Sequence, residues 1–286
     1  MDNFLKYNLL VFLMIGSVSC KGDLLGFFDS SSDDVDTRTE YSLAWNRENG
    51  FKTIISPQEE YQLCITADTH IGTTENFVKV ETVIKNSSLA IILVGDITNG
   101  REMDYQTTAT LFSYSTTDII TMAGNHDIEF GGWKYFKKYF GASVFYFEVH
   151  TPTANDLYIC LDSGNGTLGK RQYDWLKNIL ASKRENYRHC FIYSHTNLFR
   201  TDGSQTISSN MPLEETYQLM DLLGKNRING VFMGHDHHRE ELVFNGVKYV
   251  TLDALRDGMK SASYVILTVN TNYSYQFFAI ALATER

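Results

Sequence analysis

Residues 118–127 read DIITMAGNHD, an apolar run that ends in a cluster of polar side chains. Short runs rich in isoleucine and other apolar residues are typical of β-strands that are buried on both faces. The run therefore predicts a buried strand over residues 118–123. Asn125, His126 and Asp127 then lie just beyond the carboxyl end of that strand.

Four further runs repeat this pattern of an apolar strand followed by side chains that can bind metal. They read ITADTH, ILVGD, FIYSH and VFMGHDH. The side chains at their ends are Asp68, His70, Asp96, His195, His235 and His237. Ligands of an open α/β sheet bind beyond the carboxyl ends of its strands. We therefore expect all of these side chains to gather at one edge of the molecule.

The segments between these runs have helical patterns, and the last part of the chain is rich in strands. Helices are expected over residues 77–86, 102–114, 173–182 and 213–223. Alternation of strands and helices is typical of βαβ units, so the residue pattern predicts a mainly parallel sheet with both faces covered. With 286 residues, 43% of them hydrophobic, the chain is expected to form one large domain.

The candidate ligands combine carboxylate, amide and imidazole donors. They are Asp68, His70, Asp96, Asn125, His195, His235 and His237. Such a mixture suits Mn, Fe or Zn and not calcium. The set is larger than one ion with an open position needs, and it fits two ions that share a bridging carboxylate. The expected cofactor is therefore a pair of divalent metal ions (Mn, Fe or Zn).

Taken in order, these motifs resemble a known signature. The series D-x-H, G-D, G-N-H-D, H and G-H-x-H is similar to that of the calcineurin-like metallophosphoesterase superfamily. The resemblance implies an α/β fold of two packed mixed β-sheets flanked by helices, a four-layer α/β/β/α sandwich. It also implies the grouping of the ligands: Asp68, His70 and His237 on one metal, Asn125, His195 and His235 on the other, and Asp96 bridging both.

The same resemblance implies a reaction, the metal-dependent hydrolysis of phosphate mono- or diesters. A hydroxide bridging the two metals would attack phosphorus. His126 would stabilise the phosphoryl oxygens or protonate the leaving group, and Asp127 would orient the ring of His126. Two alternatives stay open: a catalytically inactive surface binding protein that retains the fold, and a nuclease of the same superfamily.

Other polar residues have less defined roles at this stage. We expect structural roles for His150, His189 and His238, and we expect Asp236 to face solvent or a neighbour of the ligands. Arg101 and Arg256 are candidates for holding the substrate phosphate, although an arginine in such a position is more often a surface charge. Asn99 stands where the purple acid phosphatase branch places a metal-binding tyrosine, and Asp162 is a candidate for shaping the pocket.

Two segments permit more than one interpretation. Residues 164–169 (GNGTLG) match the dinucleotide motif G-x-G-x-x-G. The next strand ends in Ser194 and His195 and offers no acidic residue for a ribose, so a glycine-rich loop beside the metal edge is favoured. Residues 128–141, with several aromatic side chains, are either a loop over the site or a helix packed on the core.

The N-terminus resembles a bacterial lipoprotein signal. Residues 9–18 (LLVFLMIGSV) are apolar but too few to span a bilayer, and they lead to Cys20. A plain signal peptide and a buried helix are the alternatives. We expect a signal peptide over residues 1–20, a polar tether and N-terminal extension over residues 21–55 (flexible over 21–40), and the metallophosphoesterase domain over residues 56–286. The domain would then be extracytoplasmic and lipid-anchored to a bacterial membrane, in the periplasm or at the cell surface.

Charge and cysteine usage limit the partners. The net charge of −9 argues against general nucleic-acid binding. The expected partners are a small-molecule phosphoester substrate and a membrane reached through lipidated Cys20, with a monomer favoured. Cys64, Cys160 and Cys190 lie in apolar runs, where a cysteine usually acts as a small buried hydrophobe.

Overall fold

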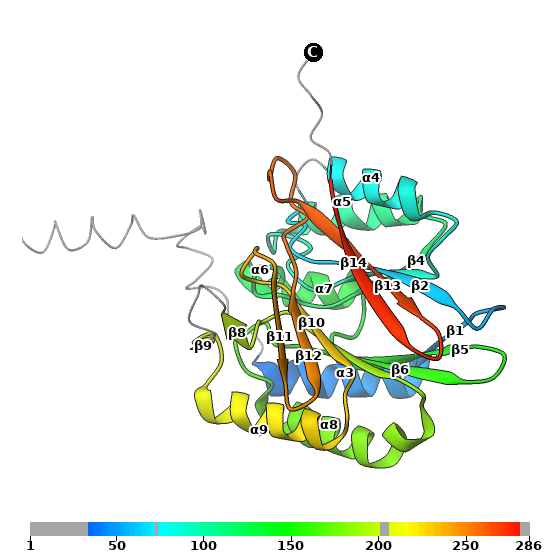
Figure 1. Cartoon of the computed structure of the whole chain (residues 1–286). Coiled ribbons are helices and arrows are strands. Elements are labelled where there is room, and N and C mark those ends of the chain that lie inside the picture. Colours follow the sequence, from blue (N-terminus) through cyan, green and yellow to red (C-terminus); the bar gives the residue numbers. More distant parts are fainter. Residues whose placement is uncertain (1–33, 72–73, 201–205, 281–286) are drawn as a thin grey trace, which may run out of the picture.

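The computed structural model describes residues 34–71, 74–200 and 206–280. The expected signal peptide, Cys20 and residues 21–33 of the expected tether lie outside these residues. Two β-sheets pack face to face, and helices cover their outer faces (Figure 1). None of the helices in the described residues combines the length and the apolar character that a membrane span requires.

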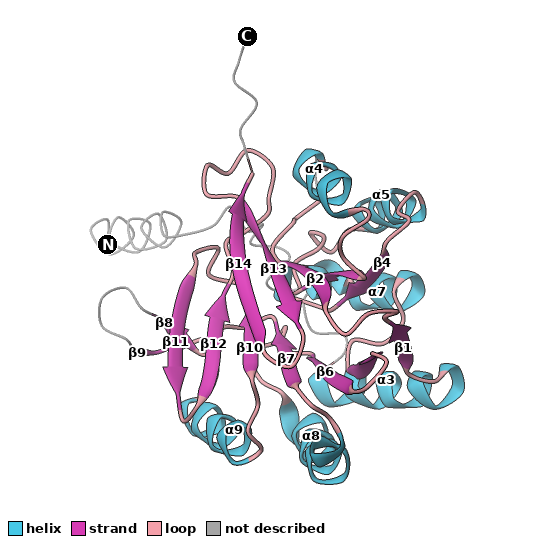
Figure 2. Cartoon of the chain, turned by 45° about the vertical axis from the view of Figure 1, so that its right-hand side comes forward, coloured by secondary structure: helices cyan, strands magenta, loops and turns pink. Residues whose placement is uncertain are grey.

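The larger sheet has seven strands of mixed direction (Figure 2). In spatial order they are β1 (Lys52–Ile55), β5 (Phe145–His150), β6 (Asn155–Leu161), β7 (Cys190–Ser194), β10 (Gly230–Met233), β12 (Val247–Thr251) and β11 (Glu240–Phe244). Strands β6, β7, β10 and β12 are parallel to one another. Strand β1 is parallel to β5, whereas β5 is antiparallel to β6 and β11 to β12.

The smaller sheet has five strands. In spatial order they are β14 (Tyr273–Ala279), β13 (Ser263–Val269), β2 (Tyr61–Thr66), β3 (Ala90–Leu93) and β4 (Asp118–Thr121). Strands β2, β3 and β4 are parallel, and β13 and β14 add an antiparallel pair. A separate short ribbon consists of β8 (Phe199–Arg200) and β9 (Thr206–Ile207).

The helices lie outside the two sheets. They are α3 (Val35–Asn49), α4 (Glu75–Ile84), α5 (Glu102–Ser113), α6 (Asn125–Ile128), α7 (Trp133–Tyr139), α8 (Gly169–Lys183) and α9 (Leu213–Lys225). Short 3-10 turns occur at η1 (Glu129–Gly131) and η2 (Arg184–Asn186). The four helices expected from the sequence correspond to α4, α5, α8 and α9.

Alternating side chains of each central strand build the layers. Leu63 and Ile65 of β2 pack between the sheets, while Cys64 faces the layer that contains α4. In β6, Tyr158 points between the sheets and Ile159 points toward α8 and α9. Because successive side chains of a strand point to opposite faces, a strand covered on both sides is apolar throughout. The expected four-layer arrangement of two mixed sheets flanked by helices is confirmed.

The mainly parallel sheet predicted from the residue pattern alone is wrong. The strands belong to two mixed sheets, and one face of each sheet is covered by the other sheet instead of by helices. An apolar run shows that both faces of a strand are buried, but it does not say whether a helix or a second sheet buries them. The resemblance to the metallophosphoesterase signature, in contrast, predicted two packed mixed sheets.

The expected flexible tether over residues 21–40 also needs a correction at its end. Helix α3 begins at Val35, and the Asp34 side chain caps it by accepting a hydrogen bond from the backbone N–H of Thr37 (2.7 Å). Strand β1 then pairs with β5 in the larger sheet. Residues 35–55 are therefore part of the folded structure, and the compact fold begins well before the expected boundary at residue 56.

Candidate metal centre

The predicted ligands meet at the carboxyl ends of five strands. Asp68 and His70 follow β2, Asp96 follows β3, and Asn125 opens α6 immediately after β4. From the larger sheet, His195 follows β7, and His235 and His237 follow β10. These strands run in the same direction within each sheet, so their ends reach one edge of the sandwich. Convergence at one edge was the prediction from the apolar runs, and the structure places every predicted ligand there.

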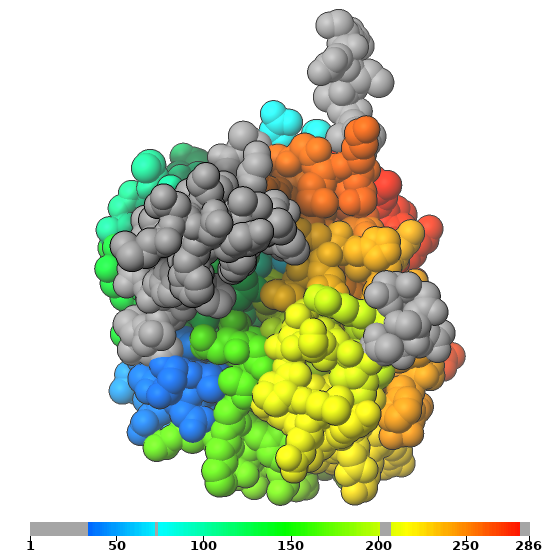
Figure 3. All heavy atoms as spheres, turned by 90° about the vertical axis from the view of Figure 1, so that its left-hand side faces the viewer, coloured from blue at the N-terminus to red at the C-terminus, as the bar shows by residue number. Residues whose placement is uncertain are grey.

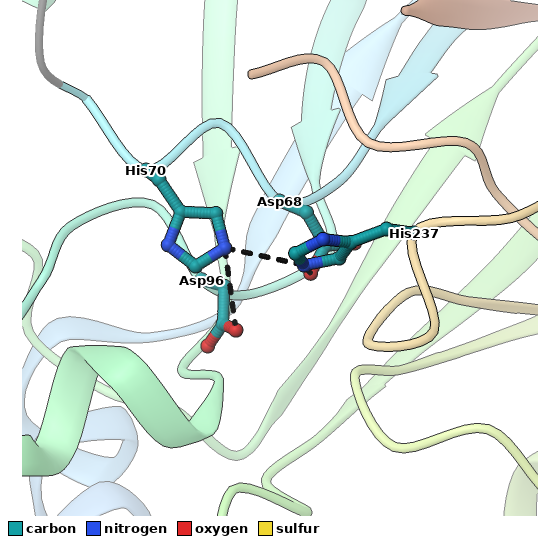
Figure 4. Close-up of side chains that lie close together, drawn as sticks. All are labelled: Asp68, His70, Asp96 and His237. Carbon is teal, nitrogen blue, oxygen red and sulfur yellow. Dashed lines mark hydrogen bonds and ion pairs between the residues drawn. The ribbon is translucent and has the colours of Figure 1, made fainter. Parts of the chain in front are cut away.

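One group of donors is formed by Asp68, His70, Asp96 and His237 (Figure 4). The Nε2 atoms of His70 and His237 are 3.3 Å apart, and His237 Nε2 lies 3.3 Å from Asp68 Oδ1. The donor atoms of this group all lie within 4.8 Å of one another. Asp68 is fully buried and His70 is 5% exposed. The spacing suits a single cation at the centre of the group.

A second group is formed around the Oδ1 atom of Asn125. His195 Nε2 lies 3.1 Å from this oxygen, and His235 Nδ1 lies 2.9 Å from it. The donor atoms of Asp96, His195 and His235 also lie within 4.8 Å of one another, close enough to share an ion. The second group therefore contains the remaining three predicted ligands together with Asp96.

Asp96 connects the two groups through one carboxylate oxygen. Its Oδ2 atom lies 3.8 Å from His70 Nε2 and 3.3 Å from His195 Nε2. Its other oxygen, Oδ1, accepts a hydrogen bond from the backbone N–H of His126 (2.8 Å). The carboxylate is thus fixed with one oxygen turned toward both groups of donors, as a bridging ligand requires.

The ligand turns carry backbone strain. Among the described residues that are not glycine, positive φ angles are concentrated at the ligands: Asp68 (53°), His70 (41°), Asp96 (50°), His235 (77°) and His237 (57°). Residues with side chains adopt this left-handed region only at a cost. Such strain persists where the surrounding structure enforces it, and it is common at functional sites.

Three glycines that precede ligands allow the turns to approach one another. A Cβ atom on Gly95 would lie 2.5 Å from His195 Nδ1, and one on Gly124 would lie 2.2 Å from Asp96 Oδ1. On Gly234 it would lie 2.6 Å from Asp68 Oδ2. Each glycine thus leaves room for a ligand from a different strand. Only Gly95 among the three has a positive φ (78°), so close approach to a ligand, and not turn geometry, is the more general reason for glycine at these positions.

Hydrogen bonds orient two of the imidazoles so that one ring nitrogen is free to bind. His195 Nδ1 donates to the carbonyl oxygen of Val94 (2.9 Å), and His70 Nδ1 donates to Asn99 Oδ1 (3.2 Å). With these tautomers, each Nε2 atom presents a lone pair to other acceptor atoms of its group. Facing acceptors repel one another unless a proton or a cation lies between them. The donor set therefore fits a pair of cations.

The pKa values show that neighbouring charges at this edge depend on one another. Burial alone would lower the pKa of His195, but the Asp96 carboxylate beside it raises this pKa to about 10. Burial would raise the pKa of Asp96, but His195 and His70 hold it below its ordinary range. At His235, burial and the nearby charge of His195 lower the pKa to about 4. Charge at this edge is thus strongly interdependent, as expected of a cation site.

A family model described as calcineurin-like phosphoesterase matches residues 61–239. The chain belongs to the calcineurin-like phosphoesterase family. The match covers all of the ligand turns and ends before β11, and it leaves α3 and β1 outside. No match was found among curated proteins.

Solved structures with the same fold support this assignment at the level of architecture. A purple acid phosphatase from yellow lupin (Lupinus luteus) has a TM-score of 0.60 and 13% identity, with 78% of this chain and 52% of that chain covered. For a putative 5'-nucleotidase from Staphylococcus aureus the TM-score is 0.57 and the identity 11%, with 79% and 55% covered. GAP50 of Plasmodium, described as an anchor in the inner membrane complex, has a TM-score of 0.62 and 10% identity, with 78% and 85% covered. The chain spans about half the length of the first two proteins.

The role predicted for Asp127 is wrong. This carboxylate does not contact the ring of His126, because it accepts hydrogen bonds from the backbone N–H groups of Gly124 (2.9 Å), Ile97 (3.2 Å) and Thr98 (2.8 Å). Asp127 is fully buried, and burial together with the charge of Asp96 raises its pKa to about 7. It joins the turn after β3 to the turn after β4 and so fixes the positions of Asp96 and Asn125.

Glu129 holds His126 instead. Its Oε2 atom lies 3.1 Å from His126 Nδ1, while the His126 ring packs edge-on against His70 with ring centroids 4.8 Å apart. His126 therefore lies beside the first donor group, as expected of a residue that faces a substrate. Glu129 was not among the residues predicted from the sequence, although its spacing of three residues from His126 was a usable signal.

Asn99 is the second partner that the sequence analysis missed. Its Oδ1 atom orients His70, and its backbone N–H donates to Asp104 Oδ2 (3.2 Å). From the sequence, Asn99 was noted only as the position at which the purple acid phosphatase branch has a metal-binding tyrosine. Residues that orient a metal ligand through its second ring nitrogen are a regular part of metal sites, but a single asparagine has no recognisable motif.

The remaining candidates have structural surroundings. Asp236 accepts hydrogen bonds from Arg200 Nε (3.1 Å) and from Asn197, so it faces neighbours of the ligands. His150 contacts Glu148, and His189 contacts the carbonyl oxygen of Asn270. His238 is exposed and, like these two, lies outside the donor groups that could hold a metal. Cys64, Cys160 and Cys190 are buried and unpaired, as expected.

The segments with two interpretations are settled by packing. Residues 133–139 form α7, and its Trp133 and Phe136 side chains are buried in a core cluster, so this segment packs as a helix. The glycine-rich loop lies beside the metal edge, because a Cβ on Gly164 would lie 2.9 Å from the carbonyl oxygen of Gly124. Arg101 stacks over the Phe130 ring next to Glu129, whereas Arg256 is exposed.

Proposed function

We propose that this chain is a two-metal phosphoesterase that hydrolyses small phosphate mono- or diesters. The observation that carries the proposal is the position of Asp96 Oδ2, which faces His70 of one donor group and His195 of the other. A carboxylate shared in this way, with carboxylate, amide and imidazole donors on both sides, matches the requirements of two divalent ions such as Mn, Fe or Zn.

When bound, such ions supply positive charge to the phosphoryl oxygens and lower the pKa of water. The chain's own residues hold the reacting groups. Asp68, His70 and His237 would hold one ion, Asn125, His195 and His235 the other, and Asp96 both. His126, oriented by Glu129 through Nδ1, would present Nε2 to the substrate, where it stabilises a phosphoryl oxygen or protonates the leaving oxygen.

The donor set also separates this proposal from the inactive binding protein. A protein that had lost turnover would not need seven converging donors, a strained backbone at five of them and an oriented histidine beside them. The anchor role described for GAP50 of Plasmodium belongs to a protein only 10% identical to this chain, so that similarity extends to the fold alone. We therefore favour the enzyme.

The test is hydrolysis by purified protein of p-nitrophenyl phosphate and of bis(p-nitrophenyl) phosphate, with Mn²⁺, Fe²⁺ or Zn²⁺. Chelator-treated protein is the control. Metal-dependent turnover of either ester is expected, together with about two bound ions per chain. Absence of bound metal and of turnover with all three ions would favour the binding protein. A panel of natural monoesters, diesters and cyclic nucleotides would then define the substrate, and a plasmid-nicking assay would test the nuclease alternative.

We also propose that the enzyme acts outside the cytoplasm, attached to a membrane through lipidated Cys20. The support is the apolar segment of residues 9–18 and its position before Cys20. Expression of the full-length chain and of Cys20→Ser in a bacterial host, with a labelled fatty acid, tests this. The wild-type chain should carry the fatty-acid label and be found in the membrane fraction, and Cys20→Ser should lose the label. A wild-type chain without label would contradict the proposal.

A further inference from the structure

The buried face of helix α3 is polar. Arg38, Ser42 and Asn46 follow one another at intervals of four residues, so they lie along one face of the helix. All three are buried, and Arg38 is fully so. Each contacts the segment around β5 and β6: the Asn46 side-chain amide donates to the carbonyl oxygen of Val144 (2.8 Å), and Ser42 Oγ accepts from the backbone N–H of Ser143 (3.1 Å).

Arg38 makes the most extensive of these contacts. Its Nε and Nη2 atoms donate to the two carboxylate oxygens of Asp162, at 2.8 Å and 2.7 Å. Asp162 has no solvent exposure and also accepts from Ser143 Oγ (2.7 Å). A third donor, Arg38 Nη1, contacts Asn165 Oδ1. Paired hydrogen bonds between a guanidinium and a carboxylate fix the orientation of both groups.

The loop held by Arg38 contacts two ligand turns on its other side. Ser163 Oγ accepts from Ser194 Oγ (3.0 Å) and from the backbone N–H of Thr196 (2.8 Å), which are the two neighbours of His195. The Ser163 carbonyl oxygen also accepts from Thr196 Oγ1 (2.7 Å). The next residue, Gly164, packs against the backbone of Gly124, immediately before Asn125. Residues 162–165 thus lie between α3 and the turns that carry Asn125 and His195.

We propose that Arg38 is a positioning residue of the metal centre. Through Asp162 it holds residues 162–165 against the turns of Asn125 and His195, and so it fixes the second donor group. The inference rests on the proposed two-metal function and extends it to a helix that lies outside the residues matched by the family model. Helix α3 packs beside α8, and its blue atoms lie on the surface of the molecule (Figure 3).

Loss of the Arg38 contact is expected to affect one donor group and not the other. The contacts of residues 162–165 described above lead to the turns of Asn125 and His195, which belong to the second donor group. The first group is held differently, since Asp68 accepts from the backbone N–H of His235 and the backbone N–H of His70 donates to the carbonyl oxygen of Asp96 (2.9 Å). Loss of the Arg38 contact should therefore weaken binding of one of the two ions and leave the other in place.

The experiment measures metal binding by full-length chains of wild type and Arg38→Met, by competition with a chelator of known Zn²⁺ affinity. Wild type should bind two ions. Arg38→Met should bind one ion with unchanged affinity and the second about tenfold or more weakly, in the range found when residues behind a metal ligand are replaced. Its turnover should be restored by raising the metal concentration, which a general loss of folded protein would not allow.

Two further variants complete the test. Arg47→Met, on the exposed last turn of the same helix, is the matched control and should bind both ions as wild type does. If Arg38→Met does not fold, the double variant Arg38→Met with Asp162→Asn removes both charges and avoids a buried carboxylate without its partner. Wild-type affinity for both ions in the folded variant would overturn the inference, whereas a wild type that binds no metal would overturn the proposed function itself.

Discussion

The ligand turns form the metal edge, and helix α3 reaches it only through residues 162–165, but the turns alone could be found in the sequence. Each turn places polar donors directly after an apolar strand, as in residues 90–96 (AIILVGD), so the change from apolar to polar is visible. Helix α3 contributes through Arg38, Ser42 and Asn46, whose polarity resembles that of an exposed helix or of a linker. The difference teaches that sequence patterns reveal donors at strand ends but not the buried polar contacts behind them.

The largest effect is expected at the residue that joins the two donor groups. Asp96→Asn removes the shared negative charge, so turnover should fall by orders of magnitude and bound metal should decrease. Steady-state kinetics and metal analysis measure both. The matched control is Asp118→Asn at the start of β4, an exposed carboxylate that pairs with Lys52. Equal activity of Asp96→Asn and the control would show that the ligand turns do not form the catalytic site.

His126→Ala separates chemistry from metal binding. Since His126 is beside the donors but not among them, kcat should fall about 10²- to 10⁴-fold while the metal content remains at two ions. The matched control, His150→Ala, removes a histidine that contacts Glu148 on β5. A loss of metal in His126→Ala, or no change in kcat, would count against its assignment to the substrate.

Gly124→Ala tests whether close approach, and not turn geometry, requires glycine at this position. The added methyl group would lie 2.2 Å from Asp96 Oδ1, so the affinity for metal should fall, by about tenfold or more. Gly230→Ala is the control, because its nearest neighbour would be 3.4 Å away. If Gly124→Ala and Gly230→Ala bound metal equally well, the close approach of Gly124 to Asp96 would not be required for metal binding.

Glu129→Gln should produce the smallest effect of this series. Glutamine can still contact His126 Nδ1 but lacks the charge, so kcat should fall about tenfold with unchanged metal content. Glu102→Gln, on an exposed pair with Lys138, is the control. If Glu129→Gln behaves like this control, the orientation of His126 depends on other contacts.

The fold was predictable from the sequence wherever burial followed a simple period. The strands β2, β3, β4, β7 and β10 and the helices with an apolar face were located from such patterns. The division into two sheets was not, because an apolar strand looks the same under a helix or under a second sheet. Helix α3 was not located either, since its buried face is polar.

The candidate site shows the same limit. All seven ligand candidates were identified, because their donors follow strands and match a known series of motifs. The contacts behind these ligands and behind His126 were missed or assigned wrongly: Glu129 in place of Asp127 for His126, Asn99 for His70, and Arg38 for the loop at Asp162. These contacts join residues by long-range geometry or by a local spacing that many sequences share by chance.

The central claim is that two cations occupy this edge with Asp96 between them. A crystal of the protein grown with Mn²⁺, with anomalous diffraction recorded near the manganese absorption edge, measures this directly. Two anomalous peaks are expected, one among Asp68, His70 and His237 and one among Asn125, His195 and His235. A single peak, or peaks held by other residues, would contradict it.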